Sequence, residues 1–151
     1  MQQAMPEQDI ILTNENEVSV NLIQSLLEKN HCSCVQLYER FSKYLQQDKK
    51  NYCGKFICFT NSEKTKLYGI VFASNAGLIL HCFSTDLTKP VVLKIINLLS
   101  DFLTNRNIYC VSGEITGTNL LALAIKTCGK FSAPVVQRKY TLMEFNHNLS
   151  T

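Results

Sequence analysis

Residues 78–112 decide how this chain folds, and they read LILHCFSTDLTKPVVLKIINLLSDFLTNRNIYCVS. The stretch opens and closes with short apolar runs, Leu78–Phe83 and 108–112, which are typical of strands. Between them, Thr88 or Lys89 can cap a helix that has Pro90 in its first turn, and apolar residues then recur at helical spacing. A strand, a helix and a strand in this order predict a crossover whose two strands are parallel neighbours.

Two further apolar runs, 56–60 and 67–73, precede Leu78–Phe83. The short connections NSEKTK and SNAG contain turn-forming residues, so the three runs predict an antiparallel meander. All three runs are apolar on both faces, which indicates a sheet covered on both sides. Runs at 10–12 and 135–145 add a first and a last strand. We therefore expect an α+β fold with a mixed sheet of about six to seven strands and helices on both faces.

The chain has 151 residues, which is long enough to bury a core without staples. We expect a single domain over residues 10–147, between a disordered tail at 1–9 and a short tail at 148–151. The N-terminus lacks the basic region of a signal peptide. The longest apolar stretch, 67–83, is too short to span a bilayer, so we expect no membrane partner.

Seven cysteines are present, and several lie inside apolar runs, as at Cys58, Cys82 and Cys110. Buried free thiols that behave as small apolar side chains suit a reducing compartment. We therefore expect a cytoplasmic protein.

Charge is spread unevenly along the chain. Residues 1–48 carry three basic and seven acidic side chains, whereas residues 49–151 carry twelve and five. The overall net charge of +3 is too small to indicate a nucleic-acid partner. A basic run near the C-terminal end can either meet phosphate or a cofactor, or form a solvated face. It consists of Lys126, Lys130, Arg138 and Lys139.

Two helices are predicted between the first strand and the meander. Asn14 and Glu17 have capping-box spacing, and the apolar periodicity that follows ends near Lys29. The stretch HCSC at 31–34 starts the second helix, because Ser33 and Gln36 form a second capping box in which the serine hydroxyl accepts from the glutamine amide.

A zinc or redox reading of HCSC is the competing interpretation. Structural zinc sites need four ligands in well-spaced pairs, and the cysteine spacings here match none of the usual patterns, so we expect no metal. A thiol in the first turn of a helix is favoured as the thiolate, so Cys34 is reactive if it is exposed.

The stretch GEITGTN at 113–119 links the strand at 108–112 to a helix predicted from about Thr118 to Cys128. It matches neither G-x-G-x-x-G nor the phosphate loop that ends in Gly-Lys-Ser/Thr. The whole element order, from 10 to 145, resembles the GNAT N-acetyltransferase superfamily. In that family the helix after the fifth strand often reads Asn-x-x-Ala, followed by Gly-Phe at its end; here Asn119-Leu-Leu-Ala122 stands at that point, with Gly129 and Phe131 behind it.

The departures from the family concern its cofactor site. GNAT enzymes cradle the pyrophosphate of acetyl-CoA with a glycine-rich loop after the fourth strand, and residues 84–90 here contain no glycine. Asp86 would place a negative charge beside the pyrophosphate, and Pro90 removes an amide donor. Lys126 stands where the family has its general-acid tyrosine. The fourth strand, where the family often has a carboxylate, has none here and offers only His81 in its place.

The resemblance thus implies two hypotheses, and HCSC leaves a third. The first is a non-catalytic domain without a cofactor, similar to the N-terminal halves of two-domain GNAT proteins, which packs on a catalytic GNAT domain or a second copy of itself. The second is an active acetyl-CoA-dependent N-acetyltransferase with an unusual loop. The third is a cysteine-based redox or metal protein. For the second, the cofactor-binding candidates are Phe83, Ser84, Thr85 and Asn119, and the catalytic candidate is His81. If no cofactor uses the gap beside Leu78–Phe83, we expect side chains such as Phe83 to fill it.

Overall fold

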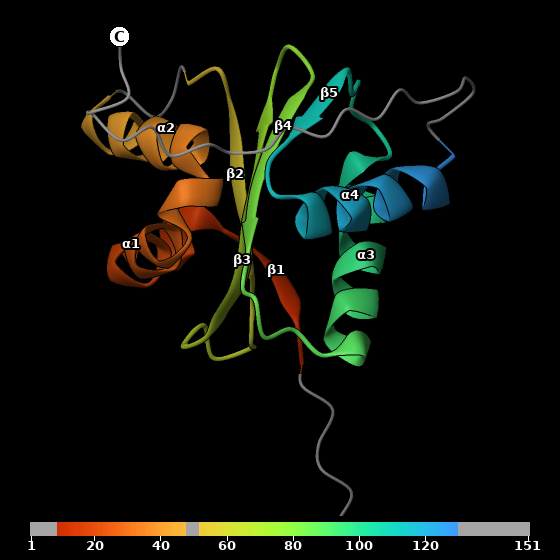
Figure 1. Cartoon of the computed structure of the whole chain (residues 1–151), viewed down its shortest axis with the longest axis horizontal. Helices are drawn as coiled ribbons and strands as arrows, with labels where there is room; N and C mark the ends of the chain where they lie inside the picture. Colours follow the sequence, from red (N-terminus) through yellow and green to blue (C-terminus); the bar gives the residue numbers. More distant parts are fainter. Residues whose placement is uncertain (1–8, 48–51, 130–151) are drawn as a thin grey trace, which may run out of the picture.

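A computed structural model describes residues 9–47 and 52–129 of the chain (Figure 1). The strands are β1 (Ile11–Asn14), β2 (Gly54–Thr60), β3 (Leu67–Ser74), β4 (Leu78–Phe83) and β5 (Cys110–Ser112). The helices are α1 (Val20–Lys29), α2 (Val35–Gln46), α3 (Lys89–Leu103) and α4 (Ile115–Thr127), with 3-10 turns at Glu15–Glu17 and His31–Ser33.

The five strands form one mixed sheet in the order β1-β2-β3-β4-β5. The pairs β1–β2, β2–β3 and β3–β4 are antiparallel, which confirms the predicted meander. The strands β4 and β5 are parallel neighbours joined through α3, so the predicted crossover is confirmed as well. Thr88 is the N-cap of α3 and Pro90 lies in its first turn, as expected.

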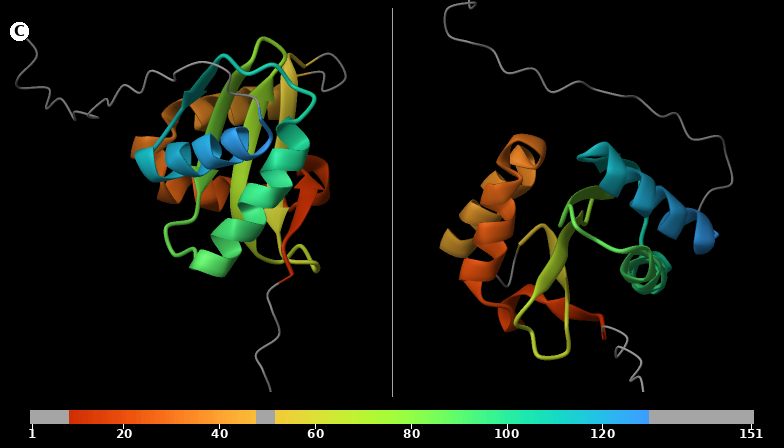
Figure 2. Two further views of the ribbon diagram at one scale, coloured as in Figure 1. Left: turned by 90° about the vertical axis from the view of Figure 1, so that its right-hand side faces the viewer. Right: turned by 60° about the horizontal axis from the view of Figure 1, so that its bottom comes forward.

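Helices cover both faces of the sheet (Figures 1 and 2). The helices α1 and α2 lie on one face, and α3 and α4 lie on the other. Successive residues of β2 alternate between the two apolar layers: Phe56 and Cys58 pack toward α1 and α2, whereas Ile57 and Phe59 pack toward α3 and α4. This alternation explains why the strands are apolar on both faces.

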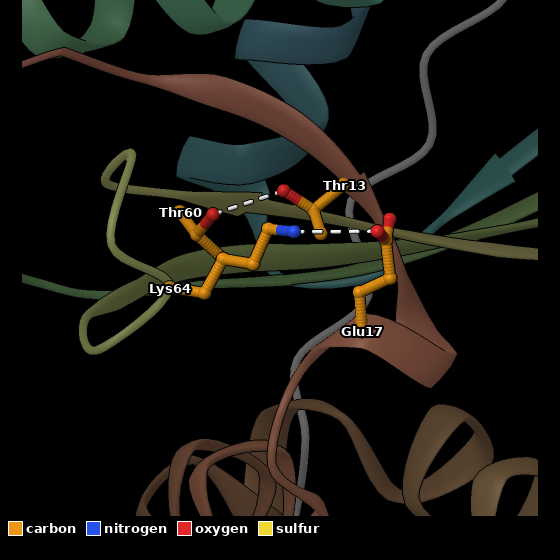
Figure 3. A network of polar contacts seen from close by, with 4 residues as sticks. All are labelled: Thr13, Glu17, Thr60 and Lys64. Carbon is orange, nitrogen blue, oxygen red and sulfur yellow. Dashed lines mark hydrogen bonds and ion pairs between the residues drawn. The ribbon is translucent and has the colours of Figure 1, made fainter.

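The edge strand β1 is held to β2 by polar contacts as well as by its ladder (Figure 3). The hydroxyls of Thr13 and Thr60 are 3.0 Å apart and buried. Beyond the end of β1, Lys64 Nζ lies 3.2 Å from Glu17 Oε1. Because that ion pair is exposed to water, it contributes about 0–1 kcal/mol, and the buried hydroxyl pair is the more specific restraint on register.

The predicted start of the first helix was wrong. Asn14 is the last residue of β1, where it pairs with Ile57, and its side chain makes no capping bond. A 3-10 turn and a buried Val18 separate the strand from α1, whose N-cap is Ser19. The capping-box spacing therefore marks the turn that leaves the sheet, while α1 begins at Val20 and ends at Lys29, close to the predicted end.

HCSC does start the second helix, but not through the predicted cap. The hydroxyl of Ser33 donates to the Asn30 carbonyl at 3.0 Å and makes no bond to the Gln36 amide. Residues 31–33 form a 3-10 turn, and α2 starts one residue later than predicted, with Cys34 as its N-cap. The short connection to α1 accounts for this, because it keeps Ser33 turned back toward Asn30.

Two other expectations need correction. Cys110 is exposed rather than buried, because β5 lies at the edge of the sheet among the described residues. The helix after GEITGTN begins at Ile115, three residues before the predicted start at Thr118. The predicted strand at 135–145 and the tail at 148–151 lie outside the described residues. Of the helices that the structure describes, none has the length and apolar character needed to cross a membrane.

Candidate functional site

In the described part of the chain, β5 ends where its pairing with β4 ends, so an opening remains beside the second half of β4. The ladder between β4 and β5 covers only residues 78–80 of β4, opposite Cys110–Ser112. Beyond Leu80, β4 continues to Phe83, whereas the chain after β5 turns into α4. This opening is where the sequence predicts either a cofactor or filling side chains.

The imidazole of His81 occupies the opening. It is 2% exposed, and its Nε2 lies 2.9 Å from the hydroxyl oxygen of Thr118. Two glycines make room for the ring: a Cβ on Gly113 would lie 2.4 Å from Nε2, and a Cβ on Gly117 would lie 2.5 Å from Nδ1. Phe83 lies beside the imidazole, with ring centroids 5.7 Å apart, so Phe83 fills part of the opening but His81 is the side chain pressed between the glycines.

The environment of His81 sets its protonation state. Burial lowers the pKa of His81 to about 4, and the nearby Glu114 carboxylate opposes this shift. The imidazole is therefore neutral at neutral pH. A buried, neutral ring with one hydroxyl partner fits a packing role. Of the four cofactor candidates, the described contacts of His81, the catalytic candidate, include only Phe83.

The four cofactor candidates do come together. A pocket of about 350 Å³ lies between the end of β4, the loop before α3 and the first turns of α4, and we call it the α3–α4 pocket. Its volume is at the lower end of the range for small-molecule sites. Its lining includes all four candidates and is mostly apolar. The lining residues are Phe83, Ser84, Thr85, Leu87, Val92, Glu114, Thr116, Gly117, Asn119, Leu120 and Leu123.

The amides at the start of α4 are already occupied. The Glu114 carboxylate accepts from the amides of Thr116 and Gly117 at 2.9 and 3.2 Å. Burial acts to raise the pKa of Glu114, but these hydrogen bonds prevail and lower it, so the carboxylate is charged at neutral pH. The protein thus supplies its own anion at the helix end that would otherwise attract one.

The loop before α3 is occupied in a similar way. The amide of Ser84 donates to the Tyr68 carbonyl at 2.9 Å, and its hydroxyl donates to the carboxylate of Asp86. That hydrogen bond is the main reason why the pKa of Asp86 is lowered. Both donors of Ser84 therefore already have partners within the protein, and one of these partners is an anion.

The basic run does not reach this pocket in the described part of the chain. Lys126 is exposed in the last turn of α4, and twelve residues of helix separate it from Glu114, about 18 Å at 1.5 Å per residue. Among the lining residues that the structure describes, none is Lys or Arg. The other three residues of the run, from 130 to 139, lie outside the described residues.

HCSC borders a second, smaller pocket of about 190 Å³, which we call the α2 pocket. It lies where the start of α2 faces the ends of the paired parts of β4 and β5. Its lining residues are Cys32, Ser33, Cys34, Val35, Gln36, Leu37, Leu80, His81, Ser112 and Gly113. His81 thus borders the α2 pocket, while the neighbouring Gly117 borders the α3–α4 pocket.

The cysteines of HCSC lie in different surroundings. Cys32 is exposed, whereas Cys34 is 6% exposed, so the exposure that a reactive Cys34 requires is absent. The ring of His31 packs edge-on against Tyr38, with centroids 5.1 Å apart. Within residues 9–47 and 52–129, no three or more His, Cys, Asp or Glu side chains gather as a metal site would require.

Glu114 and Thr118 belong to this region and were missed by the sequence reasoning. A glutamate directly before a helix is a recognisable signal, but it was overlooked because the helix was predicted to begin at Thr118. The hydroxyl of Thr118 contacts His81, a residue 37 positions away, and a contact of this kind has no local signal.

Comparisons with protein-family models, with curated proteins and with solved structures find no match to this chain.

Proposed function

We propose that this chain is a non-catalytic domain of the GNAT type that has lost its acetyl-CoA pyrophosphate loop and serves as a binding or packing module. The order of strands and helices supports the family assignment, together with the position of the α3–α4 pocket at the end of β4. The observation that carries the non-catalytic part is the occupation of that pocket's donors by Asp86 and Glu114.

The physical argument concerns charge and free donors. A pyrophosphate needs several free amides, close approach of the backbone and no competing anion. Here Asp86 stands in the loop that would receive it, and Glu114 stands at the start of α4 on the other side of the same pocket; each carboxylate has a lowered pKa. Pro90, in the first turn of α3, has no amide hydrogen to offer. Acetyl-CoA would therefore have to displace existing hydrogen bonds and approach like charges.

A packing role is supported by the distribution of exposed apolar side chains. Of the six large apolar residues that are exposed in the described part of the chain, four lie on α3, on α4 or beside β5. A catalytic GNAT domain or a second copy of this chain is the partner we propose for that side. The four residues are Leu93, Tyr109, Ile115 and Leu123.

Calorimetric titration of acetyl-CoA and CoA into the purified chain, at near-physiological salt, tests the proposal. We expect no saturable heat and no thermal shift. A ligand that did bind would be detected, because at a hundred times its dissociation constant it would add about 2.7 kcal/mol of stability. Saturable micromolar binding that is lost in Ser84→Ala or Thr85→Ala would contradict it and support the acetyltransferase alternative. Lys55→Ala, at an exposed position on β2, is the matched control and leaves either result unchanged.

A further inference from the structure

The α3–α4 pocket combines apolar walls with a carboxylate, on the face of the sheet that α3 and α4 cover (Figure 1). Its apolar side chains come from β4, from the loop before α3 and from both helices, and they are Phe83, Leu87, Val92, Leu120 and Leu123. The pocket holds about 350 Å³, which is room for a small molecule only. The walls therefore offer a small ligand the burial of its apolar surface.

The carboxylate of Glu114 is the charged group of this lining. The backbone amides of Thr116 and Gly117 hold it in place at 2.9 and 3.2 Å, so its position is fixed by the start of α4. These donors are neutral amides and leave the negative charge in the pocket without a cation. An ionised carboxylate can accept further hydrogen bonds, so Glu114 can also receive a donor from a ligand.

The loop before α3 adds a second negative charge. Asp86 lies between two lining residues, Thr85 and Leu87. Lys66 and Lys29 act on Asp86 from outside the lining, so it is the weaker of the two charges. Within the described part of the chain, no Lys or Arg belongs to the lining. An anion is therefore repelled, whereas a cation with an apolar body finds both of its parts matched.

We propose that the α3–α4 pocket binds a small alkylammonium ligand, with the ammonium group at Glu114 and the alkyl chain against the apolar walls. An alkylamine is protonated at neutral pH, as the side chain of lysine is. One N–H of the ammonium group donates to the carboxylate in a charge-assisted hydrogen bond, and the alkyl chain leaves water. The amine is held as a ligand and takes part in no group transfer.

The volume of the pocket sets the size of the ligand. Hexylamine occupies about 200 Å³, if each of its seven heavy atoms takes about 30 Å³ as a water molecule does. It therefore fits within the roughly 350 Å³ of the pocket. This inference rests on the proposed function, because it takes the pocket as one that no pyrophosphate enters.

Titration of the full isotope-labelled chain at pH 7, followed by the NMR chemical shifts of its backbone amides, tests the proposal with hexylamine as the probe. We expect saturable shifts at Thr116, Gly117 and Leu123. 1-Hexanol, which has the same chain length but no charge, should bind about fivefold more weakly, the factor expected of a partly exposed ion pair. Hexanoate, whose charge is reversed, should give no saturable shift at these amides.

Two variants separate the charge of Glu114 from the rest of the pocket. Glu114→Gln keeps the length of the side chain and removes its charge, so it should weaken hexylamine about fivefold and leave 1-hexanol unchanged. Glu39→Gln removes the same charge from an exposed position on α2 and is the matched control, which should change neither affinity.

The comparison of the three probes on the wild-type chain does not depend on whether any variant folds. Equal affinities for hexylamine and 1-hexanol would overturn the proposal, and so would hexylamine shifts that lie outside the pocket or do not saturate. If acetyl-CoA also fails to bind, the proposed function stands without this ligand. Saturable binding of acetyl-CoA in its own titration would instead contradict the proposed function itself.

Discussion

The imidazole of His81 lies against the backbone at the start of α4, where Gly113 and Gly117 leave space for it. Close approach of this kind is a packing requirement, because each Cβ would come within 2.5 Å of a ring nitrogen. The same contact places Nε2 beside Thr118. One side chain therefore positions the beginning of a helix relative to β4, and it fills the opening beside the second half of that strand.

Gly117→Ala should destabilise the protein by about 1–3 kcal/mol through overpacking, although alanine in place of glycine stabilises most helix positions. Chemical denaturation at neutral pH measures this free energy of unfolding. In a His81→Ala background the same change should cost less, since the ring it strikes is gone, and the difference is the coupling energy of a double-mutant cycle. A stabilising Gly117→Ala in the wild-type background would show that the glycine is not needed for the imidazole.

The stability of the protein should fall as the pH decreases from about 6.5 to about 4. Burial lowers the pKa of His81 to about 4 in the folded state, so between these values the unfolded chain binds a proton that the folded protein does not. The stability that comes from keeping His81 neutral is fully present above pH 6.5, and about 3 kcal/mol of it is lost at pH 4.

Denaturation curves of wild type and His81→Gln between pH 4 and 8 check this sign. The variant keeps a hydrogen-bonding group but cannot titrate, so its stability should fall less over this range, and carboxylates affect both proteins alike. Parallel curves would show that His81 does not titrate in this way.

At the scale of single elements, the helices α2 and α4 start in different ways. The helix α4 has a side-chain cap, because the Glu114 carboxylate accepts from two amides of its first turn. The helix α2 has none, and the hydroxyl of Ser33 bonds backward to Asn30. The start of α2, where Ser33 matched the capping pattern, is therefore less strongly capped than the start of α4.

Glu114→Ala should cost about 1–2 kcal/mol of stability at pH 7, whereas Ser33→Ala should cost less than the roughly 1 kcal/mol expected of a lost cap. The Glu114 contribution should be present above its unfolded pKa of 4.5 and disappear as the pH falls through the lower folded value. Thermal unfolding of the two variants side by side shows which substitution lowers stability more. If Ser33→Ala were the more harmful change, the assignment of caps would be wrong.

At the scale of the whole molecule, one sheet separates two apolar layers. The layer between the sheet and α1 and α2 contains the aromatic residues Phe41, Phe56 and Phe72, and the opposite layer contains side chains such as Ile95 and Leu99. The strand β3 lies in the middle, paired on both sides and covered on both faces. The sheet therefore has its most protected backbone at β3 and less protection toward its edges.

Hydrogen–deuterium exchange followed by mass spectrometry should find the slowest exchange in peptides of β3, because its amides are released only when the sheet opens. Peptides that cover β1 and the start of α4 should exchange faster. Equal protection of β1 and β3 would contradict this expectation, because β1 pairs with only one neighbouring strand in the described sheet.

Local sequence signals determined the elements of this protein and much of their arrangement. The alternation of apolar residues and the short turns predicted the meander, and the long amphipathic helix between two strands predicted the parallel crossover, because both depend on neighbours in the chain. The grouping of Phe83, Ser84, Thr85 and Asn119 came from the resemblance to GNAT enzymes and not from a local signal, and the structure places all four around one pocket.

Only the tertiary structure decided what these residues contact. Whether Ser33 caps α2 depends on how closely α1 precedes it, and whether Ser84 has a free donor depends on the carbonyl of Tyr68 and the carboxylate of Asp86. The neighbours of His81 arise between segments far apart in the chain. Periodicity records which face of an element is buried, but hydrogen-bond partners and close packing depend on where the other elements are placed, and that information is not local.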